Sequence, residues 1–126
     1  MKLGVVKPDE TKEFETSERC SILEVLDDVD DSAMSMARAR VAAGVTTAWH
    51  HLVGVAERYV ILQGQGRVEI GALTPQVVEV GDAVCIPAEV RQRIQNTGES
   101  DLIFYAICTP RFTPECYVPL EESELS

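Results

Sequence analysis

Two side chains that could bind a metal ion or carry a proton lie within one short stretch, GVTTAWHHLVGVAERYVILQG, from Gly44 to Gly64. His50 follows Gly44 by six positions, Glu57 follows His50 by seven, and Gly64 follows Glu57 by seven. An imidazole changes its charge near neutral pH and is a common metal ligand. A buried carboxylate requires a cation, a proton or hydrogen-bond donors. This stretch therefore indicates a site for acid–base or metal chemistry.

A second stretch, GDAVCIPAEVRQRIQN, runs from Gly81 to Asn96 and places Gln92 eleven positions after Gly81. Its carboxamide oxygen is a further polar group that could accept a hydrogen bond or bind a metal ion. His51 is a weaker candidate, although it follows His50 directly. Adjacent residues on a strand point to opposite faces, so only a local bulge would bring both imidazoles together. We interpret His51 as a surface or interface histidine.

The elements that would position these residues are short strands. Runs rich in Val, Ile, Thr and aromatic residues alternate with turn-prone Gly, Pro and Asp, and no segment keeps a long helical apolar period. Examples of such runs are Cys20–Leu26 and Ser35–Ala43, which the acidic loop Asp27–Ser32 separates. Many short strands at this spacing predict an all-β sandwich or barrel.

Length and charge limit the architecture and the partners. The 126 residues suit one domain over 1–126, with a core at about 33–110, N-terminal strands within 1–26 and a C-terminal tail at 119–126. The net charge of −10 disfavours nucleic acid as a partner. Without an apolar run of membrane-spanning length or a secretory signal, we expect no membrane partner and a cytoplasmic location. The four cysteines form no CxxC pair and are expected to be reduced thiols.

Together the two stretches resemble the two signature motifs of the cupin superfamily, over roughly Ala33 to Pro110. The runs ERC, ERYVILQGQGRVEIG and QRIQNTGESDLIFYAICTPRF are similar to small single-domain cupins. The resemblance implies a cupin-type double-stranded β-helix, or jelly-roll, barrel with a pocket at one end. It also implies a homodimer, formed through edge strands. Five turn-forming residues fall at the positions where the cupin motifs have them: Gly44, Gly64, Gly81, Pro87 and Asn96.

The resemblance also implies a ligand set. Many cupins hold one divalent metal ion through three histidines and a glutamate. In this chain His50 and Glu57 occupy the first histidine and the glutamate positions, whereas Leu52 and Gln92 replace the other two histidines. The expected metal ligands are therefore His50, Glu57 and Gln92, and Mn, Fe, Zn or Ni would be the candidate ions.

Alternation along the strands predicts further pocket residues. Tyr59 and Tyr105 are expected to point inward, and their hydroxyl groups would lie near a ligand. Trp49, directly before His50, is expected to face away from the pocket.

Three functions remain open. The first is a metal-dependent cupin that binds or converts a small organic molecule, with the metal as Lewis acid or oxygen activator. The second is a metal-free module for a small-molecule ligand, or an enzyme in which His50 is the acid–base group and Glu57 orients it. The third is an interaction or structural protein whose barrel opening no longer serves as a ligand site. We favour the first, because Gln92 still supplies an oxygen where a ligand belongs. The sequence determines neither the substrate nor whether the chain is catalytic.

Overall fold

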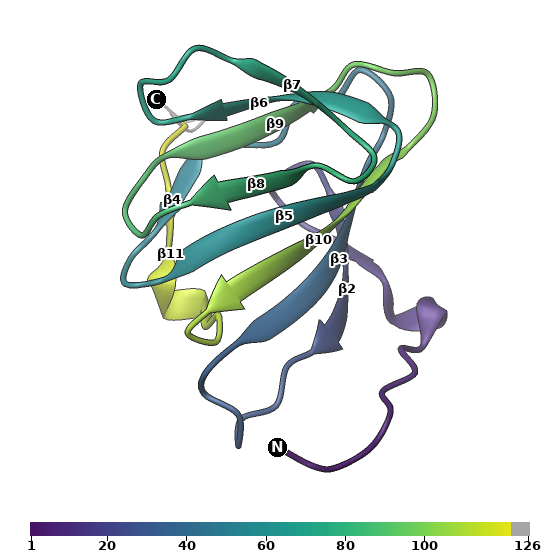
Figure 1. Ribbon diagram of the computed structural model, residues 1–126, viewed down its shortest axis with the longest axis vertical. Helices are drawn as coiled ribbons and strands as arrows, with labels where there is room; N and C mark the ends of the chain where they lie inside the picture. Colours follow the sequence, from purple (N-terminus) through teal and green to yellow (C-terminus); the bar gives the residue numbers. More distant parts are fainter. Residues whose placement is uncertain (122–126) are drawn as a thin grey trace.

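The computed structural model describes residues 1–121, which form two antiparallel sheets closed into a barrel (Figure 1). The all-β prediction is thus confirmed. Two short 3-10 helices, η1 (Glu10–Lys12) and η2 (Pro114–Cys116), accompany the strands. In chain order the strands are β1 (Phe14–Glu15), β2 (Ser21–Leu26), β3 (Ser35–Val41), β4 (His50–Leu52), β5 (Ala56–Gln63), β6 (Gln65–Ile70), β7 (Gln76–Glu79), β8 (Ala83–Ile86), β9 (Gln92–Asn96), β10 (Leu102–Thr109) and β11 (Tyr117–Pro119).

The chain passes repeatedly from one sheet to the other. One sheet has the order β1-β2-β3-β10-β5-β8, and the other has the order β11-β4-β9-β6-β7. Consecutive strands such as β4 and β5, or β8 and β9, therefore lie in different sheets. As a consequence, His50 on β4 and Glu57 on β5 reach the interior from opposite walls of the barrel.

Gly64 makes the passage from β5 to β6. Its φ of +81° lies in the left-handed region, and a Cβ atom at this position would meet the carbonyl oxygen of Asp101 at 2.9 Å. Glycine has no Cβ atom and adopts this conformation without strain. The turn that the sequence predicts at this glycine is therefore also a point of close backbone contact between β6 and the start of β10.

The core lies between the two sheets and follows the two-residue period of the strands. On β9, Gln92, Ile94 and Asn96 are buried, whereas the residues between them are half-buried. Ile94 meets side chains from the other sheet, including Ile61 of β5 and Leu102 of β10, in one buried apolar cluster. Since alternation places every second side chain of a strand inside, it also determines which polar residues enter the barrel.

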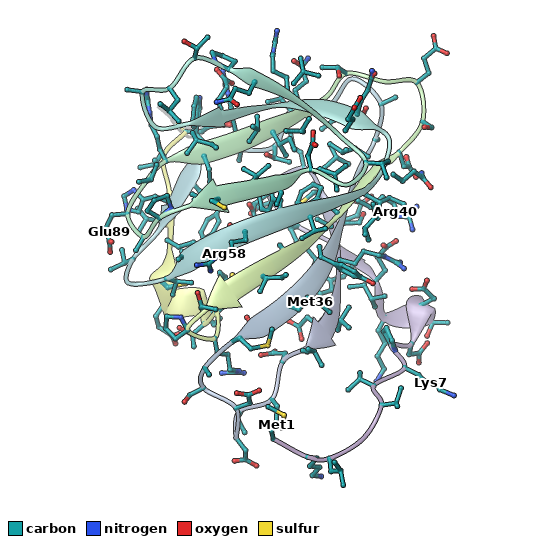
Figure 2. The ribbon with its side chains drawn as sticks, viewed as in Figure 1. Met1, Lys7, Met36, Arg40, Arg58 and Glu89 are labelled. Atoms are coloured by element: carbon teal, nitrogen blue, oxygen red, sulfur yellow. The ribbon has the colours of Figure 1, made fainter. Side chains whose placement is uncertain are left out.

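The N-terminal segment is attached to β3 by charge. Arg38 donates to Glu10 at 2.8 Å and lies 3.4 Å from Glu13, and Arg40 lies 3.2 Å from Glu13 and 3.0 Å from Asp101. Figure 2 shows Arg40 near the end of β3, with Met36 at its start. Each such pair contributes little to stability in solvent, but the three pairs with Glu10 and Glu13 together fix the path of the segment toward the mouth of the barrel.

The described part of the expected C-terminal tail is held against the barrel. Pro119 still belongs to β11, the Leu120 amide donates to the Trp49 carbonyl oxygen at 3.0 Å, and Glu121 pairs with Arg19 at 2.8 Å. The rest of the tail, 122–126, lies outside the described residues. Within residues 1–121, no helix has the length and the apolar character that crossing a bilayer requires.

Candidate functional site

The pairing of β4 with β9 places His50 directly opposite Gln92. Both side chains are buried, and the imidazole stacks on Tyr117 of β11 with ring centroids 4.9 Å apart. Nδ1 of His50 lies 3.0 Å from the carbonyl oxygen of Ala48 and 3.3 Å from Oε2 of Glu18. Because both neighbours are acceptors, Nδ1 carries the proton and donates it. The other ring nitrogen, Nε2, is therefore the one that can take up or release a proton.

Glu57 is the least compensated buried group of the site. Its Oε2 accepts a weak hydrogen bond from Sγ of Cys108 at 3.6 Å, whereas its Oε1 is buried and has no hydrogen-bond partner among residues 1–121. Burial raises the pKa of this carboxyl to about 6; the charge on His50 opposes the rise, and the nearby Glu18 adds to it. Glu57 can therefore hold or release a proton close to neutral pH.

Gln92 is already engaged within the barrel. The Tyr59 hydroxyl donates a short hydrogen bond to its Oε1, and burial raises the pKa of Tyr59 well above the usual value. The carboxamide also lies close enough to Glu57 to lower the pKa of that carboxyl. The Tyr59 ring packs on Phe104, with centroids 4.4 Å apart. The structure thus brings His50, Glu57 and Gln92 together, with Tyr59 between Gln92 and the core.

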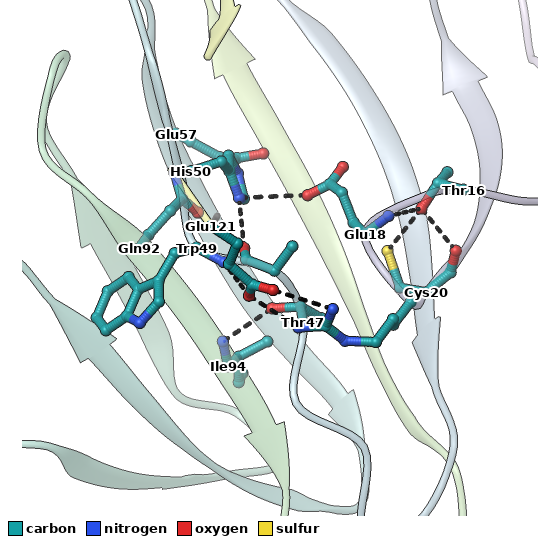
Figure 3. A network of polar contacts seen from close by, with 12 residues as sticks. Thr16, Glu18, Cys20, Thr47, Trp49, His50, Glu57, Gln92, Ile94 and Glu121 are labelled. Carbon is teal, nitrogen blue, oxygen red and sulfur yellow. Dashed lines mark hydrogen bonds and ion pairs between the residues drawn. The ribbon is translucent and has the colours of Figure 1, made fainter. Parts of the chain in front are cut away.

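Two adjoining cavities lead to this group. The inner cavity, of about 60 Å³, is bordered by His50, Leu52, Glu57 and Tyr59. The outer cavity, of about 220 Å³, opens between β2, β3 and β10. Five lining residues are common to both: Glu18, Ile22, Glu57, Ala106 and Phe112. Figure 3 shows Glu18 reaching toward His50 from the N-terminal side of the mouth, with Glu57 beside the imidazole.

Not every residue expected in the pocket lies there. Tyr105 is half-buried and lines neither cavity, because Phe104 and Ala106 are the residues of β10 that face inward. Tyr105 therefore lies on the outer face of the sheet, against the expectation. Trp49 does face away from His50, with the guanidinium groups of Arg91 and Arg93 over its ring at 4.9 and 4.3 Å from the centroid.

Sequence reasoning missed Glu18 and Tyr117, which both contact His50. Glu18 reaches the mouth because the turn from Thr16 to Cys20 is attached to the chain before β4: the Ala48 amide donates to the Glu18 carbonyl oxygen at 3.1 Å. Burial raises the pKa of the Glu18 carboxyl, and the charge on His50 opposes this. Neither residue lies within the two recognised stretches. Glu18 begins the cupin-like run ERC, but that resemblance gave its side chain no role, and no local pattern marks Tyr117.

Of the three expected metal ligands, two have an unengaged donor atom and the third already accepts a hydrogen bond. His50 Nε2 and Glu57 Oε1 are available, but Gln92 Oε1 already accepts from Tyr59 and Leu52 offers no donor. Within residues 1–121, no group of three or more His, Cys, Asp and Glu side chains is arranged to hold a metal. Two free donors leave most of a coordination shell to water or ligand.

Comparison with solved structures gives matches to the fold. KdgF from Halomonas sp. superposes with a TM-score of 0.76 at 14% identity, over 89% of this chain and 97% of that one. A predicted oxalate decarboxylase from Thermotoga maritima gives 0.75 at 23% identity, over 85% and 99%. A histidine-to-glutamine variant of Streptomyces PAC13 with uridine gives 0.78 at 14% identity, over 96% and 92%. No curated protein sequence matches this chain significantly.

The sequence itself matches a family. The cupin domain family covers residues 37–108, which run from β3 to the end of β10 and include both recognised stretches. These residues are more than half of the chain and hold the two-sheet barrel with His50, Glu57 and Gln92 inside it. The protein is therefore a member of the cupin family.

Proposed function

We propose that this cupin binds a small organic molecule in the mouth of its barrel, and that His50 and Glu57 exchange protons with it without a resident metal ion. The observation that carries the proposal is Glu57, which borders both cavities and whose buried Oε1 has no hydrogen-bond partner within residues 1–121. An unsatisfied buried polar atom costs free energy and is retained where it has a use. A bound ligand that donates to Oε1 would remove this cost.

The two groups are suited to opposite roles in proton transfer. Nδ1 of His50 is fixed by the Ala48 carbonyl oxygen, so that only Nε2 changes its protonation. The carboxyl of Glu57 has a pKa of about 6 because it is buried, so near neutral pH either protonation state is accessible. A base and an acid beside one small cavity suit an elimination or an isomerisation, in which one proton is removed and another is delivered.

One structural neighbour supports this reaction class. Pac13 is described as a nucleoside dehydratase, and its fold superposes with a TM-score of 0.75 at 13% identity. A dehydration removes a proton from carbon and delivers one to the departing hydroxyl group. At this identity the likeness supports the barrel as a suitable scaffold for such chemistry, while the proposal depends on His50 and Glu57.

A metal ion bound by His50, Glu57 and Gln92 is the second candidate, and the same unpartnered Oε1 of Glu57 favours it. If bound, the ion would supply a Lewis acid at the inner cavity. Binding in this way would require Gln92 Oε1 to serve both the ion and the Tyr59 hydroxyl.

Metal content and chelation distinguish the two candidates. Protein purified without metal resin should contain far less than one metal ion per chain, and its melting temperature should not change on treatment with a chelator. A mixture of small neutral, anionic and cationic compounds, followed by amide NMR, should shift resonances of β4, β5 and β9. His50→Gln should weaken that binding. Stoichiometric metal, or a chelator-dependent loss of stability, would favour the second candidate instead.

Pairing of two copies stays a prediction, as does the cytoplasmic location. The edge strand β7 exposes Val77 to 71% and so offers an apolar site for pairing. Size-exclusion chromatography with light scattering should give the mass of a dimer at micromolar concentration, and the mass of a monomer would contradict this.

A further inference from the structure

The inner and outer cavities are small and differ in wall chemistry. Their volumes of about 60 and 220 Å³ lie below the roughly 300–1,000 Å³ typical of sites for drug-sized ligands. The outer cavity is mostly apolar, with Met36 at the start of β3 on one side (Figure 2). Its apolar walls also include Phe14, Ile22, Leu26 and Phe112. The ligand that fits is therefore small and has an apolar body.

The Asp, Glu, Lys and Arg side chains among the described residues that line the two cavities are all acidic. No Lys or Arg side chain among residues 1–121 lines either cavity, whereas four acidic side chains do: Glu18, Glu24, Asp27 and Glu57. Arg111 lies outside the lining; its Nε is 2.7 Å from the Asp27 carboxylate, and its charge also acts on Glu24, so that it offsets the outer acids and not Glu18 or Glu57. Among residues 1–121, His50 is the one basic side chain that borders the two cavities, and its Nδ1 lies 3.3 Å from Glu18. An anionic ligand would therefore meet repulsion along the whole path to His50.

The innermost acid is the one without a partner. Oε1 of Glu57 is buried and receives no hydrogen bond within residues 1–121, and Glu18 lines the same junction between the two cavities. A carboxylate accepts hydrogen bonds only, so it is satisfied by a donor, most strongly by a charged one. An ammonium group carries three donors and one positive charge.

We infer that the ligand is a small organic cation, a protonated amine with an apolar body, whose ammonium group lies between Glu57 and Glu18 and whose body lies against the apolar walls of the outer cavity. The inference rests on the proposed function, because it names the class of molecule that the same mouth takes. Such a ligand gives Glu57 Oε1 its missing donor and balances the acidic lining.

Three compounds of matched size test the charge. Benzylamine, protonated at neutral pH, should bind and shift amide resonances of residues that line both cavities. Benzyl alcohol should bind at least about tenfold more weakly, because it lacks the charged hydrogen bonds, and benzoate should not bind detectably. Each titration is done by NMR on the same 126-residue chain, with calorimetry for the dissociation constants.

Variants locate the ammonium site. Glu18→Gln keeps the shape of the side chain, removes its charge and should weaken benzylamine roughly tenfold or more. The matched control is Glu99→Gln, an exposed carboxyl in the turn after β9, which should leave the dissociation constant unchanged. Glu24→Gln, at the outer cavity, should give a smaller loss and replaces Glu18→Gln if that variant does not fold.

The outcomes separate the inference from the proposed function. If benzoate or benzyl alcohol shifts the mouth resonances at least as strongly as benzylamine, the mouth is a ligand site and the charge assignment is wrong. The charge assignment is likewise wrong if benzylamine, benzyl alcohol and benzoate bind equally well to the wild type, to Glu18→Gln and to Glu24→Gln. If no compound of any charge shifts these resonances, both the inference and the proposed function fail.

Discussion

The two ends of β9 both hold a buried polar side chain in the barrel, yet the two ends are satisfied to different degrees. At the closed end, the Asn96 amide donates to the carbonyl oxygens of Val41 and Ser100 at 2.9 and 2.8 Å, and Oδ1 accepts from the Gly98 amide at 2.9 Å. At the open end, beside Gln92, Glu57 keeps one buried oxygen without a partner. A fully satisfied polar group stabilises the fold, whereas an unsatisfied one is a candidate for binding.

The largest effect is expected at the closed end. Asn96→Ala should lower the free energy of unfolding by about 3 kcal/mol, because it removes three hydrogen bonds and leaves one buried and two partly buried backbone groups without this partner. Urea denaturation followed by circular dichroism measures this loss. Gln95→Ala, one position earlier, is the control: the Gln95 side chain accepts from Arg67 at the surface, and its loss should cost less than about 0.5 kcal/mol. Equal losses for the two variants would remove the contrast between the ends of β9.

The next largest effect is expected when a second histidine is introduced at the open end. Leu52 lines the inner cavity with His50 and Glu57, so Leu52→His should add the missing imidazole donor and create a metal site. Zinc at about 100 times its dissociation constant should then stabilise the variant by about 2.7 kcal/mol. Differential scanning calorimetry with and without zinc measures the change in melting temperature.

The control for this gain is Val53→His. Val53 is 51% exposed and follows Leu52 directly, so it carries the same new side chain outside the cavity. Any stabilisation through the four free cysteines would be common to both variants. A zinc response of Leu52→His no larger than that of Val53→His would mean that the three donors do not converge.

The third effect concerns the pH dependence of stability. The folded-state pKa of Glu57 is about 6, above its ordinary 4.5, so the folded protein holds this proton more tightly than the unfolded chain does. The contribution of Glu57 is therefore fully present below pH 4.5 and is lost as the pH rises through about 6. The loss corresponds to about 2 kcal/mol. Glu57→Gln should remove this loss and be more stable than the wild type at neutral pH.

Urea denaturation from acid to neutral pH, for wild type and Glu57→Gln, measures the difference. Only the difference between the two curves is informative, because Glu18 also has a raised pKa and Glu69 a lowered one. Glu99→Gln, at the surface, should follow the wild-type curve. If Glu57→Gln shows the wild-type decline between these pH values, the carboxyl is not the unsatisfied group.

The sequence was sufficient for the strands and for the central group of the site. Alternation within a strand predicts which side chains share a face, and the resemblance to the cupin motifs implied that His50, Glu57 and Gln92 would meet. Glu18 and Tyr117 could not, because each reaches His50 through contacts between distant segments, as in the bond from the Ala48 amide to the Glu18 carbonyl oxygen. Tyr105 shows the other limit. Alternation separates Tyr105 from Phe104, but it does not tell which of the two faces inward.

The smallest effect concerns the tyrosine that connects the open end to the core. Tyr59→Phe removes the donor to Oε1 of Gln92 and should lower the free energy of unfolding by about 1 kcal/mol. The loss stays small because the ring keeps its contact with Phe104 at 4.4 Å between centroids. Tyr105→Phe is the matched control, since that hydroxyl lies outside both cavities and its removal should leave stability unchanged. A larger loss for Tyr105→Phe than for Tyr59→Phe would mean that Tyr105, and not Phe104, faces the interior from β10. A loss near zero for both would mean that the Tyr59 hydroxyl does not hold Gln92, so that the carboxamide oxygen is free for a ligand and the open end is less satisfied than the contrast with Asn96 already indicates.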